Sequence, residues 1–166
     1  MISKETLQQY LFRHRYDGKT LGSGATRVAF YCKKYDRVFK YSIVGWEPDK
    51  DNRQAIREFD LSQSLPEHYK KFIPVEQYEQ VLYNGKLIDV IVMPKVMPLN
   101  SEKEFYQAYK NSYCRDFLQF AEKYYHLEKN ATEEFRNFVS QYHLTDLQWA
   151  NIGIYQNHFV MVDAGI

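Results

Sequence analysis

The stretch YHLTDLQWANIGIYQNHFVMVDAGI, residues 142–166, decides how the rest of the sequence is interpreted. Residues 152–155 and 158–162 have the pattern of two short strands, and Gln156 and Asn157 between them predict a tight turn. A small hairpin is therefore expected in this part of the chain.

Polar side chains flank this predicted hairpin. Because a hairpin returns the chain on itself, Asn151 and Asp163 are expected at neighbouring strand ends, with Asp146 one short loop away. Carboxylate and amide oxygens suit a hydrated divalent cation such as Mg²⁺. The alternative is that Asp146 and Asp163 are ordinary turn or cap residues.

Length and composition bound the protein class. The 166 residues can form one domain with a real core or two small lobes. A hydrophobic content of 45% with 15 Tyr and 11 Phe predicts a globular chain. The net charge of +1, from 22 basic and 21 acidic residues that are interspersed, argues against a nucleic-acid-binding protein.

Three further features predict a cytoplasmic protein with no membrane partner. Cys32 and Cys114 lack metal-ligand spacing and are expected to be buried free thiols. Residues 1–10 contain no apolar secretory segment. The longest apolar run, residues 87–94, is short and is interrupted by Asp89, so no membrane span is expected.

The N-terminal part predicts a helix over residues 3–16 and then the segment LGSGATRVAFYC, residues 21–32. Gly22 and Gly24 let the backbone turn tightly and approach a phosphate, although a plain hairpin uses glycine in the same way.

A lysine in the next predicted strand gives these glycines a possible context. Lys40 shares one face of the strand RVFKYSIV with Val38, so it either meets solvent or meets phosphate under the glycine turn. The following helix, residues 53–64, carries Glu58 beside its apolar stripe. That carboxylate either pairs with Lys40 or is a solvated helix charge.

The rest of the chain predicts a β-hairpin followed by helices. Asn84 and Gly85 favour a type I′ turn between strands at 75–83 and 86–93, and residues 94–98 are expected to be a connector. Residues 101–141 contain no glycine or proline and are expected to be helical.

Within that helical region, aromatic residues recur at helical spacing from Phe105 to Phe120, after a capping box of Ser101 and Glu104. A second helix is predicted over residues 132–142. Both aromatic stripes are interpreted as core. The sequence therefore predicts an α+β fold.

In this order, the segments resemble the protein-kinase-like superfamily over nearly the whole chain. Each matching motif is weak alone, but their order along the chain is that of the family. They are LGSG at 21–24, VFK at 38–40, Glu58 on a helix, a hinge at 93–99, TDLQWAN at 145–151 for D-L-x-x-x-N, and DAG at 163–165 for D-F-G.

The resemblance implies a two-lobed fold in a single kinase-like domain, residues 1–166. The N-terminal lobe, about 17–97, would hold an antiparallel sheet and one glutamate-bearing helix of the αC type. The hinge would lie at about 93–99, the reduced helical C-terminal lobe at about 100–166, and the extra helix at 3–16.

The resemblance also implies roles for the polar residues. Lys40 would bridge the α- and β-phosphates of ATP and be held by Glu58, while Asn151 and Asp163 would bind Mg²⁺. Asp146 would orient the attacking hydroxyl group and accept its proton.

The implied nucleotide contacts come from the glycine turn, the lysine–glutamate pair and the hinge. They are Gly22, Ser23, Gly24, Arg27, Lys40, Glu58, Met93 and Val96. Arg27 replaces the third glycine of G-x-G-x-x-G, and it is expected to reach a phosphate or to shield the site.

Other departures from the family concern regulation and substrate binding. Leu144 and Thr145 precede Asp146 in place of the H-R pair, and Ala164 replaces the phenylalanine of D-F-G. The sequence stops at Ile166, without an activation segment, A-P-E or a further helical platform. A compact kinase-like protein of the phage and bacterial type is expected.

The function expected from the resemblance is transfer of the γ-phosphate of ATP, with Mg²⁺, to a hydroxyl group, in the manner of a Ser/Thr protein kinase. The acceptor would be a protein, including the chain itself, or a small molecule. The alternatives are a nucleotide-binding pseudokinase that acts as an interaction module, and a small-molecule kinase.

Overall fold

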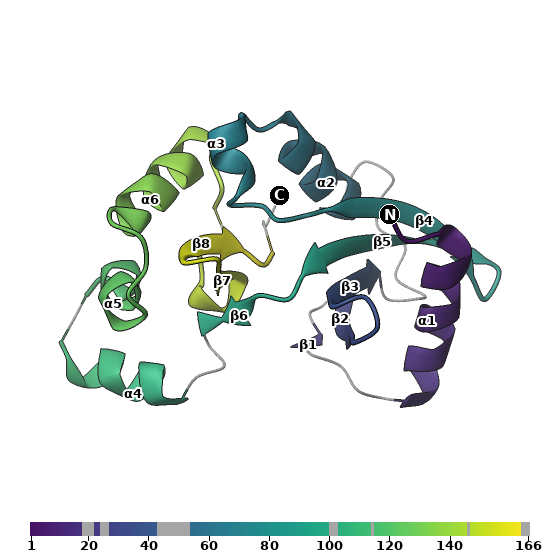
Figure 1. Cartoon of the computed structure of the whole chain (residues 1–166), viewed down its shortest axis with the longest axis horizontal. Coiled ribbons are helices and arrows are strands. Elements are labelled where there is room, and N and C mark those ends of the chain that lie inside the picture. Colours follow the sequence, from purple (N-terminus) through teal and green to yellow (C-terminus); the bar gives the residue numbers. More distant parts are fainter. Residues whose placement is uncertain are drawn as a thin grey trace. The chain divides into compact units, whose positions relative to one another are not determined.

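The computed structural model describes residues 1–17, 22–23, 27–42, 54–99, 103–113, 115–145 and 147–163. It has an α+β fold in which both sheets are antiparallel, and this confirms the α+β class predicted from the sequence (Figure 1). The chain forms two compact units: Met1–Ser64 with Val75–Lys95, and Leu65–Pro74 with Val96–Ile166.

The first unit contains two helices and five strands among its described residues. They are α1 (Lys4–Asp17), β1 (Gly22–Ser23), β2 (Arg27–Cys32), β3 (Arg37–Ser42), α2 (Gln54–Ser64), β4 (Gln77–Tyr83) and β5 (Lys86–Pro94). The strands form one sheet in the order β1-β2-β3-β5-β4.

The β4–β5 hairpin has the turn that its sequence predicts. Asn84 and Gly85 have φ angles of 50° and 76°, and a type I′ turn requires positive values at both positions. The ladder pairs Tyr83 with Lys86 and continues to Gln77 opposite Val92, so the predicted hairpin is confirmed.

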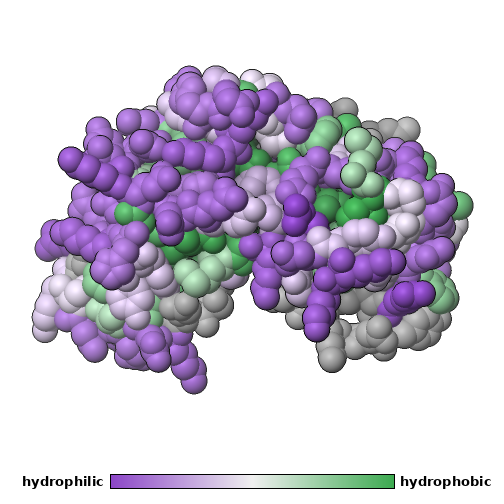
Figure 2. All heavy atoms as spheres, viewed as in Figure 1, coloured by the Kyte–Doolittle hydropathy of each residue, from purple (hydrophilic) through white to green (hydrophobic). Residues whose placement is uncertain are grey.

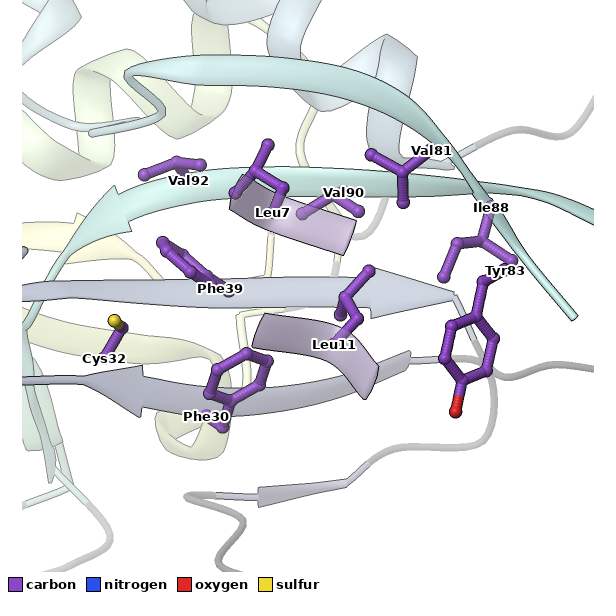
Figure 3. Packing of buried hydrophobic residues seen from close by; sticks show 10 residues of the cluster. All are labelled: Leu7, Leu11, Phe30, Cys32, Phe39, Val81, Tyr83, Ile88, Val90 and Val92. Carbon is purple, nitrogen blue, oxygen red and sulfur yellow. The ribbon is translucent and has the colours of Figure 1, made fainter. Parts of the chain in front are cut away.

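Helix α1 covers one face of this sheet. Leu7 and Leu11 are 0% and 2% exposed, and they point toward a cluster that includes Phe39 and Val90 (Figure 3). The side chain of Gln77 forms two hydrogen bonds with the backbone of Ile2 near the N-terminus. Its Oε1 accepts from the Ile2 amide at 2.9 Å, and its Nε2 donates to the Ile2 carbonyl at 2.7 Å.

Helix α2 lies against β4 and β5 (Figure 1). Phe59 of α2 stacks on Tyr78 of β4, with their ring centres 5.8 Å apart. Since neighbours in a strand point to opposite faces, Tyr78 lies on the face opposite the α1 cluster. The register pairs Lys40 with Ile91, and Ile91 with Tyr78, so Lys40 shares the face that carries α2.

The second unit contains the remaining elements. They are α3 (Glu67–Lys70), β6 (Met97–Pro98), α4 (Lys103–Asn111), α5 (Phe117–Tyr124), α6 (Ala131–Gln141), the 3-10 turn η3 (Trp149–Asn151), β7 (Ile152–Tyr155) and β8 (His158–Met161). The strands β6, β7 and β8 form a separate sheet in that order.

The β7–β8 hairpin agrees with the sequence prediction. Gln156 and Asn157 both have positive φ angles, 49° and 63°, and Tyr155 pairs with His158 across the turn. The second strand ends at Met161, one residue earlier than expected.

Residues 65–74, which the sequence prediction included in the N-terminal lobe, belong to the second unit. The Phe72 ring packs against Phe135 and Phe138 of α6, with ring centres 5.5 and 4.9 Å apart. The Met161 amide of β8 donates to the Phe72 carbonyl at 2.8 Å. This apolar packing assigns the segment to α6 and β8.

The aromatic stripe from Phe105 to Phe120 is not one helix. Helix α4 ends at Asn111, Tyr113 has a φ angle of 53°, and Asp116 caps α5 by accepting from the amides of Leu118 and Gln119 at 3.0 and 3.3 Å. A left-handed residue and a side-chain cap together interrupt the helix.

The connector predicted at 94–98 is also ordered differently. Pro94 is the last residue of β5, and Met97 and Pro98 form β6 opposite Ile154 and Gly153. These two residues therefore contribute a third strand to the C-terminal hairpin.

Gly153→Ala is expected to destabilise this second sheet. A Cβ at Gly153 would lie 2.9 Å from the Met97 carbonyl oxygen and 3.1 Å from a methyl group of Val162, so the backbone of β6 has to move. A loss of about 1–3 kcal/mol in the free energy of unfolding is expected, measured by urea denaturation.

The matched control for this substitution is Gly85→Ala in the exposed β4–β5 turn, where an added Cβ meets nothing within 4 Å. The positive φ of Gly85 gives that control a cost of its own, about 1 kcal/mol. An unchanged unfolding midpoint for Gly153→Ala would contradict the close approach of β6 and β7.

Hydrophilic side chains cover most of the surface of both units on the face shown in Figure 2. Within the described residues, no helix combines the length and the apolar character needed to cross a membrane. Cys32 is a buried free thiol, as expected, and Cys114 lies outside the described residues.

Candidate functional site

The glycine segment forms the edge of the first sheet. Gly22 and Ser23 make up β1 and pair with Ala29 and Val28 of β2. Gly24, the second glycine of the predicted phosphate turn, lies outside the described residues. Two antiparallel strands therefore stand at the predicted position, and β2 lies next to the strand that carries Lys40.

Lys40 is a buried lysine in the middle of β3. Its residue is 6% exposed, which excludes the alternative of a solvent-facing strand lysine. The Nζ atom lies 3.7 Å from Oε1 of Glu58. Because an isolated charge is costly to bury, this ion pair accounts in part for a lysine at such a position.

Glu58 belongs to the face of α2 that packs on the sheet. Ala55, Glu58 and Ser62 are the buried residues of the helix, and their spacing of three and four places them on one stripe. Glu58 is 0% exposed, so it is not a solvated helix charge. The pairing of Lys40 with Glu58 that the sequence suggested is present.

Arg27 contributes a second cation to the same carboxylate. Its Nη1 atom donates to Oε2 of Glu58 at 2.8 Å, and the residue is 5% exposed. The described structure thus directs Arg27 to Glu58, an interaction that the sequence interpretation did not anticipate. Glu58 lies between two buried cations, one on each oxygen.

The alternation of side chains along β2 and β3 could have indicated the contact between Arg27 and Glu58. Residues two apart in a strand share a face, and Ala29 of β2 lies directly opposite Lys40 of β3. Arg27 therefore lies on the same face as Lys40, one diagonal step away. Only the position of α2 adds the information that Glu58 reaches both.

The predicted hinge residues fall in two different settings. Met93 is in β5, paired with Val38, and is 2% exposed. Val96 is half-buried and directly precedes β6 in the second unit. A Cβ placed on Gly153 would come within 3.2 Å of a Val96 methyl group, so Val96 lies against β7.

The second unit brings Asn151 and Asp163 to the same end of its hairpin. Asn151 ends η3 directly before β7, and its carbonyl accepts from the Val162 amide at 2.7 Å. Asp163 is the next residue after Val162, and both Asn151 and Asp163 are half-buried. The neighbourhood predicted from the hairpin pattern is present, while Asp146 lies outside the described residues.

Asp163 offers carboxylate oxygen atoms and Asn151 offers an amide oxygen atom. This donor set fits Mg²⁺. Among the described residues, no group of three His, Cys, Asp or Glu side chains gathers to hold a metal. The fit therefore depends on one carboxylate and one amide beside the hairpin.

Comparison of the chain with models of known protein families gives no match, and comparison with curated proteins gives no match either.

Proposed function

We propose that the protein is an ATP- and Mg²⁺-dependent phosphotransferase that transfers the γ-phosphate to a hydroxyl group, in the manner of a Ser/Thr protein kinase. The single observation that carries this proposal is the buried ion pair of Lys40 and Glu58, with 3.7 Å between Nζ and Oε1. The resemblance of the sequence motifs to the kinase-like superfamily adds to it.

The position of the lysine supports a role with phosphate. Lys40 lies on β3, and the glycine hairpin of β1 and β2 pairs with that strand. Glycines without side chains allow the backbone amides of such a hairpin to approach phosphate oxygens. A lysine ammonium group aimed by a carboxylate supplies the positive charge that a phosphate requires.

The metal would be held in the second unit. Asn151 and Asp163 would provide its oxygen ligands, and the metal, when bound, neutralises charge on the phosphates. The chain's own contribution is to hold both donors at one end of the β7–β8 hairpin, through the bond from the Val162 amide to the Asn151 carbonyl. Asp146 would orient the acceptor hydroxyl group and take its proton.

The deciding experiment is incubation of the purified protein with γ-labelled ATP, Mg²⁺ and a cell lysate. Labelled protein bands, including the protein itself, would identify a protein kinase, whereas label in the small-molecule fraction alone would identify a small-molecule kinase. ATP binding without any transfer would favour the pseudokinase alternative. Absence of both binding and transfer would contradict the proposal.

Asp146→Asn is expected to separate binding from chemistry. Loss of the proton acceptor should lower the rate of phosphate transfer by about 10²-fold or more. The affinity for ATP should stay within about 2-fold, because Asp146 is assigned no contact with the nucleotide or the metal. Transfer at the parent rate would remove Asp146 from the mechanism.

A further inference from the structure

Glu58 has two cationic partners of unequal geometry. Arg27 Nη1 approaches Oε2 at 2.8 Å, which is the length of a charge-assisted hydrogen bond. Lys40 Nζ approaches Oε1 at 3.7 Å, which is an ion-pair distance and is longer than a hydrogen bond. The two carboxylate oxygens are therefore divided between a tight contact and a loose one.

We propose that Arg27, rather than Lys40, fixes Glu58 and thereby holds helix α2 on the sheet, and that the role of Lys40 is to bind a phosphate. The division of the two oxygens rests on the structure alone. The phosphate-binding role of Lys40 rests on the function proposed above. Arg27 is in this sense a positioning residue, because it acts through Glu58 and Lys40.

The chemistry of the two side chains suits this division of roles. An arginine guanidinium is planar, stays charged and directs its donors rigidly, whereas a lysine ammonium is a compact charge on a flexible stem. Arg27 is also held by the sheet itself, since it pairs with Ser42 at the end of the β2–β3 ladder. The tight contact thus joins α2 to β2, which in turn pairs with β3.

Packing elsewhere on α2 supports the need for such an attachment. The buried residues of the helix are Ala55, Glu58 and Ser62, which offer little apolar surface, and Phe59 adds a stacking contact with Tyr78. Ile56, Phe59 and Leu61 are only half-buried, so the hydrogen bond from Arg27 to the fully buried Glu58 adds to their packing in holding the helix.

The proposal separates the effects of two substitutions that remove one cation each. In the protein without nucleotide, Arg27→Met should raise hydrogen–deuterium exchange of the α2 amides, Gln54–Ser64, by about 10-fold or more, because the helix loses its hydrogen bond to the sheet. Lys40→Met should change that exchange by less than about 3-fold, since the Arg27 contact remains.

Two further variants complete the exchange experiment, which is measured by mass spectrometry. Arg37→Met is the matched control, because Arg37 pairs with Glu76 in the same unit but its side chain is 34% exposed. It should leave α2 exchange unchanged. Arg27→Lys keeps the charge and loses the guanidinium donors, so it should give intermediate exchange. It also decides the matter if Arg27→Met does not fold.

The nucleotide arm uses ATP with Mg²⁺ and equilibrium binding to the folded variants. Arg27→Met should weaken binding by about 10-fold, since Glu58 no longer aims Lys40. Arg27→Lys should recover part of that affinity, which a purely structural role in stability would not produce. Lys40→Met should abolish binding.

Several results would overturn the proposal. One is that the α2 amides exchange equally fast in Arg27→Met and in Arg37→Met. Another is that α2 exchange rises as much in Lys40→Met as in Arg27→Met. A loss of ATP affinity in Arg27→Met with α2 still protected would instead make Arg27 a direct phosphate ligand. If the parent protein binds no ATP, the proposed function fails, while the exchange arm still tests the Arg27 contact.

Discussion

Lys40→Met is expected to abolish the thermal stabilisation of the protein by ATP and Mg²⁺ while leaving the nucleotide-free protein folded. Methionine keeps the length of the side-chain stem and removes its charge. Glu58 retains its 2.8 Å hydrogen bond from Arg27, so the Glu58 carboxylate keeps a cationic partner. The loss should therefore appear in ligand binding and not in the fold.

The measurement is the melting temperature with and without nucleotide. A ligand at about 100 times its dissociation constant adds about 2.7 kcal/mol of stability, which is a shift of several degrees for a chain of this size. The parent should show this shift and Lys40→Met should show none. Phosphate transfer by the variant should fall by about 10²-fold or more, because one phosphate-directed charge is removed.

Lys4→Met is the matched control for this substitution. Lys4 also forms an ion pair with a glutamate of the same unit, at 3.5 Å from Glu79, but its side chain is 60% exposed. Its shift with nucleotide should equal that of the parent. If Lys40→Met shifts as much as Lys4→Met does, Lys40 has no role in nucleotide binding.

Glu58→Ala is expected to cause the largest loss of stability of any substitution proposed for this protein. It removes the carboxylate that Arg27 and Lys40 share. Both cationic residues are buried, at 5% and 6% exposed. Removal of one partner from a buried ion pair typically costs about 3–5 kcal/mol, because a charge remains in a poorly solvated place.

Chemical denaturation followed by circular dichroism measures this effect. Glu76→Ala is the control: Glu76 pairs with Arg37, but its side chain is 42% exposed, and a loss of at most about 1 kcal/mol is expected. Glu58→Met separates charge from packing, because it restores volume without charge and should remain well below the parent. Recovery of parent stability by Glu58→Met would show that only packing was lost.

The sequence was most informative where local backbone chemistry decides the structure. Asn84 with Gly85, and Gln156 with Asn157, adopt positive φ angles and form the two hairpin turns that were predicted from them. Alternation along β3 likewise places Lys40 and Phe39 on opposite faces of the sheet, because successive side chains of a strand point to opposite faces.

The sequence was less informative where a single residue interrupts a helical pattern. The aromatic spacing from Phe105 onward continues through Tyr113, yet the left-handed backbone there and the cap at Asp116 divide the segment into α4 and α5. Periodicity counts apolar positions and contains no term for a side chain that caps the next helix.

The sequence by itself determined the turns, the faces of the strands, and the arrangement of Asn151 and Asp163 at one end of a hairpin, because each depends on φ, ψ and alternation over a few residues. Only the tertiary structure decided that Arg27 binds Glu58 at 2.8 Å while Lys40 lies at 3.7 Å. Those distances depend on how α2 packs across the sheet, and no local preference specifies that packing.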